Sequence, residues 1–152
     1  MGFFKKISCV AILLYSTDAY ADNVFTEIEC LAQNIYFEAR NQPWVGKVAI
    51  ANVTLNRVKS TQFPNRICKV VKQAKRNICQ FSWYCDGKPD DNPEGDEWRK
   101  AQELAYRMLN QDYLRGISEG ATHYHATYVD PKWNKRMHLV GRIGLHIFYV
   151  ER

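Results

Sequence analysis

The spacing of apolar residues changes along this chain of 152 residues, and that change limits its fold more than any other feature. Up to about residue 112, apolar residues recur every three or four positions, as they do on one face of an α-helix. From about residue 121 onward, apolar and polar residues alternate, as in strands with one buried face. No internal repeat or long linker divides the chain. Helices first and strands later predict one compact α+β domain with a small antiparallel sheet.

The helical part contains four candidate helices. The first is predicted to begin near Thr26, because Thr26 and Glu29 have the spacing of a capping box. It should end before Pro43, since a residue that precedes proline avoids the helical conformation. Pro43 then suits the first turn of a second helix. We expect this second helix at residues 44–60. A short helix is expected at residues 66–76 and a longer one at residues 97–112.

The remaining segments are predicted to be extended or to form turns. "QFSWYC" alternates and predicts a short strand or an extended loop, and "DGKPDDNPEGD" has the composition of a surface loop. "ATHYHATYV" predicts a strand, and "DPKWNK" a turn. "HLVGRIGLHIFYV" predicts a hairpin that turns between Gly141 and Gly144.

The first 21 residues have the three parts of a secretory signal peptide. A basic start, "MGFFKK", precedes the apolar run "ISCVAILLYS" and the small-residue pattern Ala19-Tyr20-Ala21. The apolar run is too short for a membrane-spanning helix, which needs about 20 residues. We therefore predict cleavage before Asp22 and a secreted or periplasmic domain over residues 22–152. The alternative is a buried N-terminal helix.

Four cysteines remain after the predicted signal peptide, which carries Cys9. An even number in an exported chain predicts two disulfides, with three possible pairings. Cys79 and Cys85 could close a small loop, in which case Cys30 and Cys68 would join the first helix to a later segment. A zinc site is disfavoured, because no CxxC spacing is present. We expect neither a metal nor a cofactor.

Glu38 is the most conspicuous candidate for chemistry. It shares a helix face with Leu31, Asn34 and Ile35, and that face is mostly apolar. Burial would raise the pKa of this carboxyl above about 4.3, and an acid that is still protonated near neutral pH can donate a proton to a leaving oxygen. The alternative is a structural carboxylate that pairs with a nearby arginine or lysine.

Histidines gather in the predicted strands. His123 and His125 are two apart and should point to one face, while His138 and His146 lie in the C-terminal hairpin. Such a group could bind metal, line a polar pocket or be structural. The metal interpretation is weak, because no HExxH or other third-ligand pattern accompanies the pair.

"QFSWYCDG" combines amide, hydroxyl and aromatic side chains, as sugar-binding sites do. Gln80 and Ser82 could orient a sugar, and Trp83 could stack on it or belong to the core. Ser82 is not expected to be a nucleophile, because no GxSxG elbow surrounds it. The net charge of +5 suits a polyanionic partner, whether nucleic acid, membrane surface or cell wall.

Six segments occur in an order that resembles the SleB/CwlJ-type cell wall hydrolase family, which includes the spore cortex-lytic enzymes. The resemblance covers residues 29–150, and its segments are "AQNIYFEARNQPWVGKVAIANVTLNRV", "FPNRICKVV", "CQFSWYCDG", "AYRML", "ATHYHATYVDPKW" and "IGLHIFY". It implies cleavage of peptidoglycan glycan strands between N-acetylmuramic acid and N-acetylglucosamine. It also implies an α+β fold distantly similar to lysozyme and lytic transglycosylase domains.

The resemblance assigns roles to individual residues. The family's NxYxEAR-like helix, whose Glu is the catalytic acid, falls on Asn34, Tyr36, Glu38, Ala39 and Arg40. This chain departs from many relatives at Phe37, where they carry His, and at Asn41, where they carry Gly. The expected substrate-binding residues are Asn34, Tyr36, Gln80, Phe81, Ser82, Trp83, His123, Tyr124, His125 and His146. The expected partner is the glycan strand, with no nucleic acid, no stable membrane insertion after signal cleavage and a monomeric state.

A single conspicuous carboxylate favours a lytic transglycosylase. Glu38 would protonate the glycosidic oxygen and then accept the proton of the muramic acid C6 hydroxyl, which closes a 1,6-anhydro ring. Hydrolysis normally needs a second carboxylate. The loop residues Asp86, Asp90 and Asp91 are candidates for that role. Other classes left open are a metal-dependent amidase or peptidase that uses His123 and His125, and a non-catalytic wall-binding module.

Overall fold

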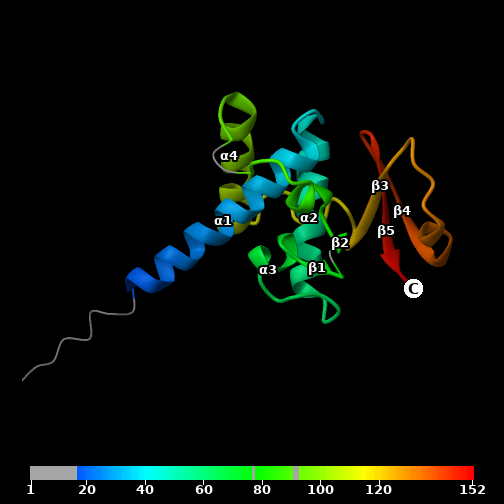
Figure 1. Ribbon diagram of the computed structural model, residues 1–152, viewed down its shortest axis with the longest axis horizontal. Helices are drawn as coiled ribbons and strands as arrows, with labels where there is room; N and C mark the ends of the chain where they lie inside the picture. The colour runs from blue at the N-terminus through cyan, green and yellow to red at the C-terminus, as the bar shows by residue number, and fades with distance from the viewer. Residues whose placement is uncertain (1–16, 77, 91–92) are drawn as a thin grey trace, which may run out of the picture.

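The structure is a computed structural model that describes residues 17–76, 78–90 and 93–152 (Figure 1). Residues 1–16, which hold most of the predicted signal peptide, lie outside the described residues. Within the described part of the chain, no helix is both long and apolar enough to cross a membrane. The elements in chain order are α1 (Thr17–Ala39), α2 (Trp44–Lys59), α3 (Ile67–Val71), β1 (Ala74–Lys75), β2 (Ile78–Cys79), η1 (Ser82–Cys85), α4 (Asp96–Asn110), β3 (His123–Ala126), η2 (Lys132–Arg136), β4 (Met137–Ile143) and β5 (His146–Glu151).

Helix α2 is the centre of the fold. All of its residues from Gly46 to Leu55 are buried, including the polar Lys47, Asn52 and Thr54. On one side it packs against α1, α3 and α4, where Leu31, Ile35 and Leu104 are fully buried. On the other side Ile50 and Val53 pack against Phe148 of the sheet. The helices cover one side of α2 and the sheet covers the other, so the helix is buried on both sides.

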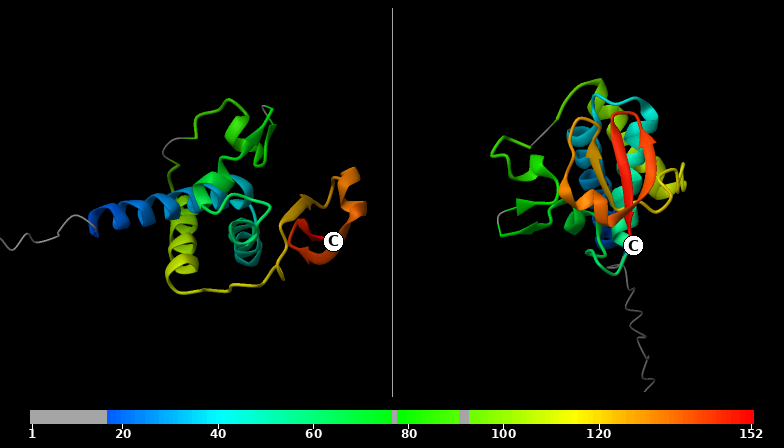
Figure 2. Two further views of the ribbon diagram at one scale, coloured as in Figure 1. Left: turned by 90° about the horizontal axis from the view of Figure 1, so that it is seen from below. Right: turned by 90° about the vertical axis from the view of Figure 1, so that its right-hand side faces the viewer.

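The C-terminal strands form one antiparallel sheet in the order β3-β5-β4, as the alternating pattern predicts. The sheet lies at the opposite end of the molecule from the start of α1, and the helices lie behind it (Figure 2). The β4–β5 turn contains Gly144, whose φ of 59° belongs to the left-handed region. In the β3–β5 register Tyr124 lies opposite Phe148 and Ala126 opposite His146, so these four residues share the face toward α2.

Both disulfides join the cysteines that the short-loop alternative paired, Cys30 with Cys68 and Cys79 with Cys85. The first attaches α1 to α3. The second explains why residues 80–85 do not form the predicted strand or extended loop. Six residues in extended conformation would span about 20 Å, whereas the Cα atoms of Cys79 and Cys85 lie 5.9 Å apart. The segment therefore coils into the 3-10 helix η1, and that prediction was wrong.

The predicted start of the first helix was also wrong. Helix α1 begins at Thr17 rather than near Thr26, and its N-terminal part projects from the rest of the fold (Figure 1). No glycine or proline interrupts residues 17–25, so nothing in the sequence requires the helix to begin later. The short helix predicted at residues 66–76 is limited to Ile67–Val71, and the small β1–β2 hairpin follows it.

Candidate active site

Glu38 lies in the last turn of α1, on the wall of a hollow of about 310 Å³ that we call the acid hollow. Its other walls come from the α1–α2 loop, the end of β3 and the β4–β5 turn. The Gln42 side-chain oxygen accepts the Leu145 N–H at 3.1 Å and so fastens that turn to the end of α1. The hollow is lined by Phe37, Glu38, Arg40, Asn41, Gln42, Ala126, Tyr128, Leu145 and His146.

Tyr124 is the hydrogen-bond partner of Glu38. Its hydroxyl donates to Glu38 Oε2 at 2.8 Å, across 86 residues of sequence. Burial raises the pKa of Glu38, and this effect exceeds the lowering by the Tyr124 hydrogen bond and by the charge of Arg57. Burial also raises the pKa of Tyr124 well above its ordinary value, so the phenol remains a neutral donor. The environment of Glu38 therefore shifts this carboxyl toward its protonated form relative to an exposed glutamate.

Arg57 of α2 is a buried cation beneath this pair. Its Nε donates to the Thr122 carbonyl at 2.7 Å, and the guanidinium lies 5.2 Å and 4.9 Å from the ring centroids of Phe63 and Phe81. Its Nη1 is buried and has no hydrogen-bond partner among the described atoms. Burial lowers the pKa of Arg57, while the neighbouring Tyr124 and Glu38 raise it. The positive charge limits how far the pKa of Glu38 rises.

The side chain of Lys47 caps the C-terminal end of α1, next to Glu38. Lys47 Nζ donates to the carbonyls of Ala39 and Arg40 at 2.9 Å and 2.6 Å, and it forms an ion pair with Glu97 at 2.8 Å. The C-terminus of a helix carries partial negative charge, which a buried ammonium offsets. Lys100 and Lys47 together lower the pKa of Glu97 to about 2. Lys47 thus fixes the backbone on which Glu38 is mounted.

Two of the predicted substrate-binding residues on α1 lie beside or beneath the acid hollow rather than on its wall. Asn34 is fully buried, accepts a hydrogen bond from Trp83 Nε1 at 3.0 Å and donates to Thr54 Oγ1 at 3.0 Å. Tyr36 packs edge-on against Phe37 and Trp98. Their observed contacts hold α1 in place.

The predicted residues of "QFSW" separate into two groups. Phe81 and Trp83 are buried, whereas Gln80 and Ser82 are exposed. Trp83 stacks on Phe37 with ring centroids 4.6 Å apart. Both rings line a second hollow of about 430 Å³, the tryptophan hollow, together with Arg40, Asp86, Lys88, Pro89 and Asp90. The two hollows share Phe37 and Arg40.

The histidines divide between the two faces of the sheet. His146 lines the acid hollow, and its ring lies edge-on to Tyr124 at 5.2 Å. Burial and, to a lesser extent, the charge of His125 lower the pKa of His146. His123 and His125 share the other face, as their spacing predicts, and both contact Trp133. They do not line the acid hollow, and in the described ranges no three His, Cys, Asp or Glu side chains form a group that could hold a metal ion.

Several residues of the acid hollow were not among the predicted site residues. Tyr128 is 86% exposed, Leu145 is half exposed, and both lie at the rim. Tyr128 follows β3 by two residues, and Leu145 follows the glycine of a hairpin turn. Neither position carries a sequence signal for binding, because only the folded chain brings this loop and this turn to the end of α1.

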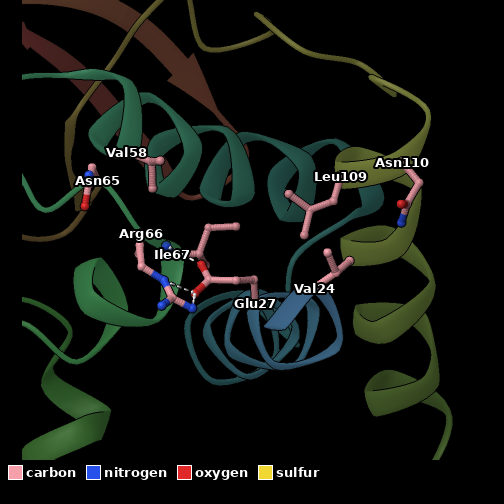
Figure 3. A pocket seen from close by; sticks show the side chains of 8 residues that line it. All are labelled: Val24, Glu27, Val58, Asn65, Arg66, Ile67, Leu109 and Asn110. Carbon is pink, nitrogen blue, oxygen red and sulfur yellow. Dashed lines mark hydrogen bonds and ion pairs between the residues drawn. The ribbon is translucent and has the colours of Figure 1, made fainter. Parts of the chain in front are cut away.

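A third hollow, the Glu27 pocket, lies beside the middle of α1 and has a volume of about 350 Å³ (Figure 3). Glu27 accepts hydrogen bonds from Arg66 Nε and Nη2 at 3.0 Å and 2.9 Å, and from the backbone N–H groups of Ile67 and Cys68 at 2.6 Å and 3.4 Å. The side chains of Val24, Val58, Ile67 and Leu109 make much of the remaining wall. None of the predicted catalytic or substrate-binding residues lies in this pocket.

Known proteins resemble this chain over most of its length. It is 51% identical over 122 residues to the spore cortex-lytic enzyme of Bacillus subtilis strain 168, which is 80% of this chain and 37% of that protein. It is 35% identical over 132 residues to the spore cortex-lytic enzyme of Halalkalibacterium halodurans, which is 85% of this chain and 35% of that protein. The chain therefore spans little more than a third of the length of these curated relatives.

Solved structures share the fold. The catalytic domain of the Bacillus cereus SleB protein matches with a TM-score of 0.67 and 27% identity, over 83% of this chain and 91% of that chain. The catalytic domain of the germination-specific lytic transglycosylase SleB from Bacillus anthracis matches with a TM-score of 0.61 and 26% identity, over 82% and 93%. The sequence pattern of the Cell Wall Hydrolase family matches residues 41–149, beginning three residues after Glu38. The chain belongs to the cell wall hydrolase family.

Proposed function

We propose that this protein cleaves the glycan strands of peptidoglycan between N-acetylmuramic acid and N-acetylglucosamine, as a lytic transglycosylase with Glu38 as its catalytic acid and base. The observation that carries the proposal is the carboxyl of Glu38, which is held by Tyr124 in a hollow without a second carboxylate among its lining residues. The likeness to a catalytic domain described as a lytic transglycosylase supports the same chemistry.

In the first step protonated Glu38 gives its proton to the glycosidic oxygen as the bond from that oxygen to C1 of the muramic acid breaks. Tyr124 donates to Oε2, which leaves Oε1 free to carry the acidic proton toward the hollow. The raised pKa keeps a larger fraction of the carboxyl protonated near neutral pH.

In the second step ionised Glu38 accepts the proton of the muramic acid C6 hydroxyl while O6 bonds to C1. The Tyr124 hydroxyl and the charge of Arg57 stabilise the carboxylate between the two steps. Glu38 ends the cycle protonated, and no water is consumed. The glycan leaves with a 1,6-anhydro end.

Hydrolysis is the second candidate, because Asp86 and Asp90 line the adjoining tryptophan hollow. The Lys88 backbone N–H, which donates to Asp86 at 2.9 Å, lowers the pKa of Asp86 and favours its ionised form. An ionised carboxylate across the sugar from Glu38 could activate a water molecule.

The products distinguish the two reactions. Purified peptidoglycan is digested with the mature protein, and the fragments are analysed by mass spectrometry. Anhydro-muramic ends support the transglycosylase, whereas reducing ends, heavier by one water, support hydrolysis. The Glu38→Gln variant should release neither product. Digestion at the normal rate by this variant would contradict the role of Glu38, and full activity in EDTA would exclude a metal-dependent amidase.

We also propose that residues 1–21 direct export and that residues 22–152 act as a monomer on the wall outside the cytoplasmic membrane. The family's wall substrate lies there, and the two disulfides suit an oxidising compartment. N-terminal sequencing of the exported protein tests cleavage before Asp22.

A further inference from the structure

Arg40 occupies the junction of three hollows around the end of α1. It lines the acid hollow with Glu38 and the tryptophan hollow with Trp83. It also lines a third hollow of about 390 Å³ beside Trp44 and Lys47. A ligand that extends from the acid hollow into either neighbour must pass this side chain.

The Arg40 side chain is exposed and has no carboxylate partner. Arg66, Arg99 and Arg107 each form an ion pair with a carboxylate, whereas Arg40 forms none with any residue in the described ranges. Its guanidinium lies 5.3 Å from the centroid of the Tyr36 ring, and Tyr36 is itself packed against Phe37 and Trp98. The ring contact holds the cation without neutralising it.

The backbone of Arg40 is fixed as well. Lys47 Nζ donates to the Arg40 carbonyl at 2.6 Å and to the preceding carbonyl at 2.9 Å. Arg40 is thus an oriented, unneutralised guanidinium two residues from the proposed acid. Guanidinium groups bind carboxylates through two parallel hydrogen bonds, and few other surface groups offer that geometry.

We propose that Arg40 binds a carboxylate of the substrate next to the bond that is cleaved, and so makes the enzyme selective for acid-bearing muramic residues. The proposal rests on the proposed function. Muramic acid differs from N-acetylglucosamine by a lactyl group, which ends either in a free carboxylate or in a peptide that carries carboxylates. Because Arg40 and Glu38 line the same hollow, a sugar whose glycosidic oxygen lies at Glu38 would present either carboxylate on the side of Arg40.

The test compares matched glycan strands. One sample is stripped of peptides by an amidase, which leaves free lactyl carboxylates, and a second is the same material coupled to methylamine, which removes their charge. A third sample retains its peptides. We expect wild-type kcat/KM to be about 10- to 100-fold higher on the stripped strands than on the coupled ones if the lactyl carboxylate is bound. If a peptide carboxylate is bound instead, only the peptide-bearing sample is preferred.

The variants separate recognition from folding. Arg40→Ala should remove the preference between charged and uncharged strands through KM, and Arg40→Lys should retain a small part of that preference. Arg99→Ala, which removes the same charge from an exposed arginine already paired with Asp96, should keep the full preference. Equal loss on all strands in Arg40→Ala, or no preference in the wild type, would overturn the proposal.

Binding to a non-cutting protein separates this proposal from the proposed function. Calorimetry with Glu38→Gln and the three strand samples measures the preference without any cleavage, and the Glu38→Gln/Arg40→Ala double variant should lack it. If wild-type protein cuts no strand but Glu38→Gln still prefers charged strands, the catalytic proposal fails and the role of Arg40 stands. Equal affinities of Glu38→Gln for charged and neutral strands would mean that Arg40 does not bind a substrate carboxylate.

Discussion

Two of the three glutamates of helix α1, Glu27 and Glu38, each line a hollow, and they have opposite environments. Glu27 and Glu38 are eleven residues apart, about three helical turns, so they lie near the same face of the helix. Within the described residues, four N–H groups donate to Glu27, whereas a single hydroxyl donates to Glu38. Several donors stabilise the ionised form of a carboxylate and keep its oxygens occupied, which suits a structural role. A carboxyl shielded from water with one donor keeps an oxygen available for proton transfer. The number of donors distinguishes the two more clearly than burial does.

The largest expected difference between the glutamates is in activity. Glu38→Gln should lower kcat/KM on peptidoglycan by about 10²- to 10⁴-fold, the usual contribution of a general acid. Glu27→Gln should leave kcat/KM unchanged, because Glu27 lies about three helical turns from Glu38 in a pocket that shares no lining residue with the acid hollow. Turbidity clearing of purified walls measures both. A large loss of activity in Glu27→Gln with a normal melting temperature would show that Glu27, and not Glu38, is the catalytic acid.

The second difference is in stability, because the part of α1 around Glu27 is also crosslinked, through Cys30. Removal of the Cys30–Cys68 disulfide as a double alanine variant should lower the free energy of unfolding by about 4 kcal/mol, since it closes a loop of 38 residues. Removal of Cys79–Cys85, which closes six residues, should lower it by about 2 kcal/mol. Urea unfolding of the two variants supplies the check. A larger loss for the short loop would mean that native packing near η1, and not chain entropy, sets the effect.

The glutamates should also respond in opposite directions to neutralisation. Glu27→Ala leaves two backbone N–H groups and Arg66 without this acceptor and should lower the free energy of unfolding by about 1–2 kcal/mol.

Glu38 has a raised pKa in the folded protein, so the stability it contributes is present below its unfolded pKa and is lost as pH rises through the folded pKa. Glu38→Gln should therefore match the wild type near pH 4 and melt at a higher temperature near pH 7. Melting temperatures of both proteins between pH 4 and pH 7 test this. A wild type that is more stable than Glu38→Gln at pH 7 would contradict the expected pH dependence.

The smallest expected effect is a displaced pH profile. Tyr124→Phe removes the one donor to Glu38, and this donor lowers the pKa of the carboxyl. The pKa of Glu38 should rise further, so the fall in kcat/KM on the alkaline side moves to higher pH. Initial rates between pH 4 and pH 9 measure the shift, with Tyr106→Phe on an exposed tyrosine as the matched control. A shift to lower pH would mean that Tyr124 acts through packing alone.

Local sequence patterns were sufficient for the fold class and for most elements. Repeated apolar spacing located α2 and α4, and alternation located the three-stranded sheet. The patterns failed at two segments. The Cys79–Cys85 bridge coils an alternating segment into η1, and the capping-box spacing at Thr26 lies inside a continuous helix.

The candidate site was predictable only in part. Glu38 was singled out because its helix face is apolar, and that face is indeed in the core: Leu31, Asn34 and Ile35 are fully buried. The spacing of His123 and His125 suggested a site, whereas the tyrosine between them carries no such pattern. Strand alternation nevertheless turns Tyr124 toward Glu38 and both histidines toward Trp133. Which face of a strand meets a given helix depends on register and packing, and neither is encoded within the strand.

The sequence by itself determined the order of the main helices and strands and the presence of an acid on an apolar helix face, because these depend on the spacing of neighbouring residues. Only the tertiary structure decided that Tyr124 donates to Glu38, that Arg57 lies beneath them and that Arg40 stands where three hollows meet. These relations join residues up to 86 positions apart. Long-range contacts form because burial of the whole core favours one arrangement, and no local pattern specifies which side chains then become neighbours.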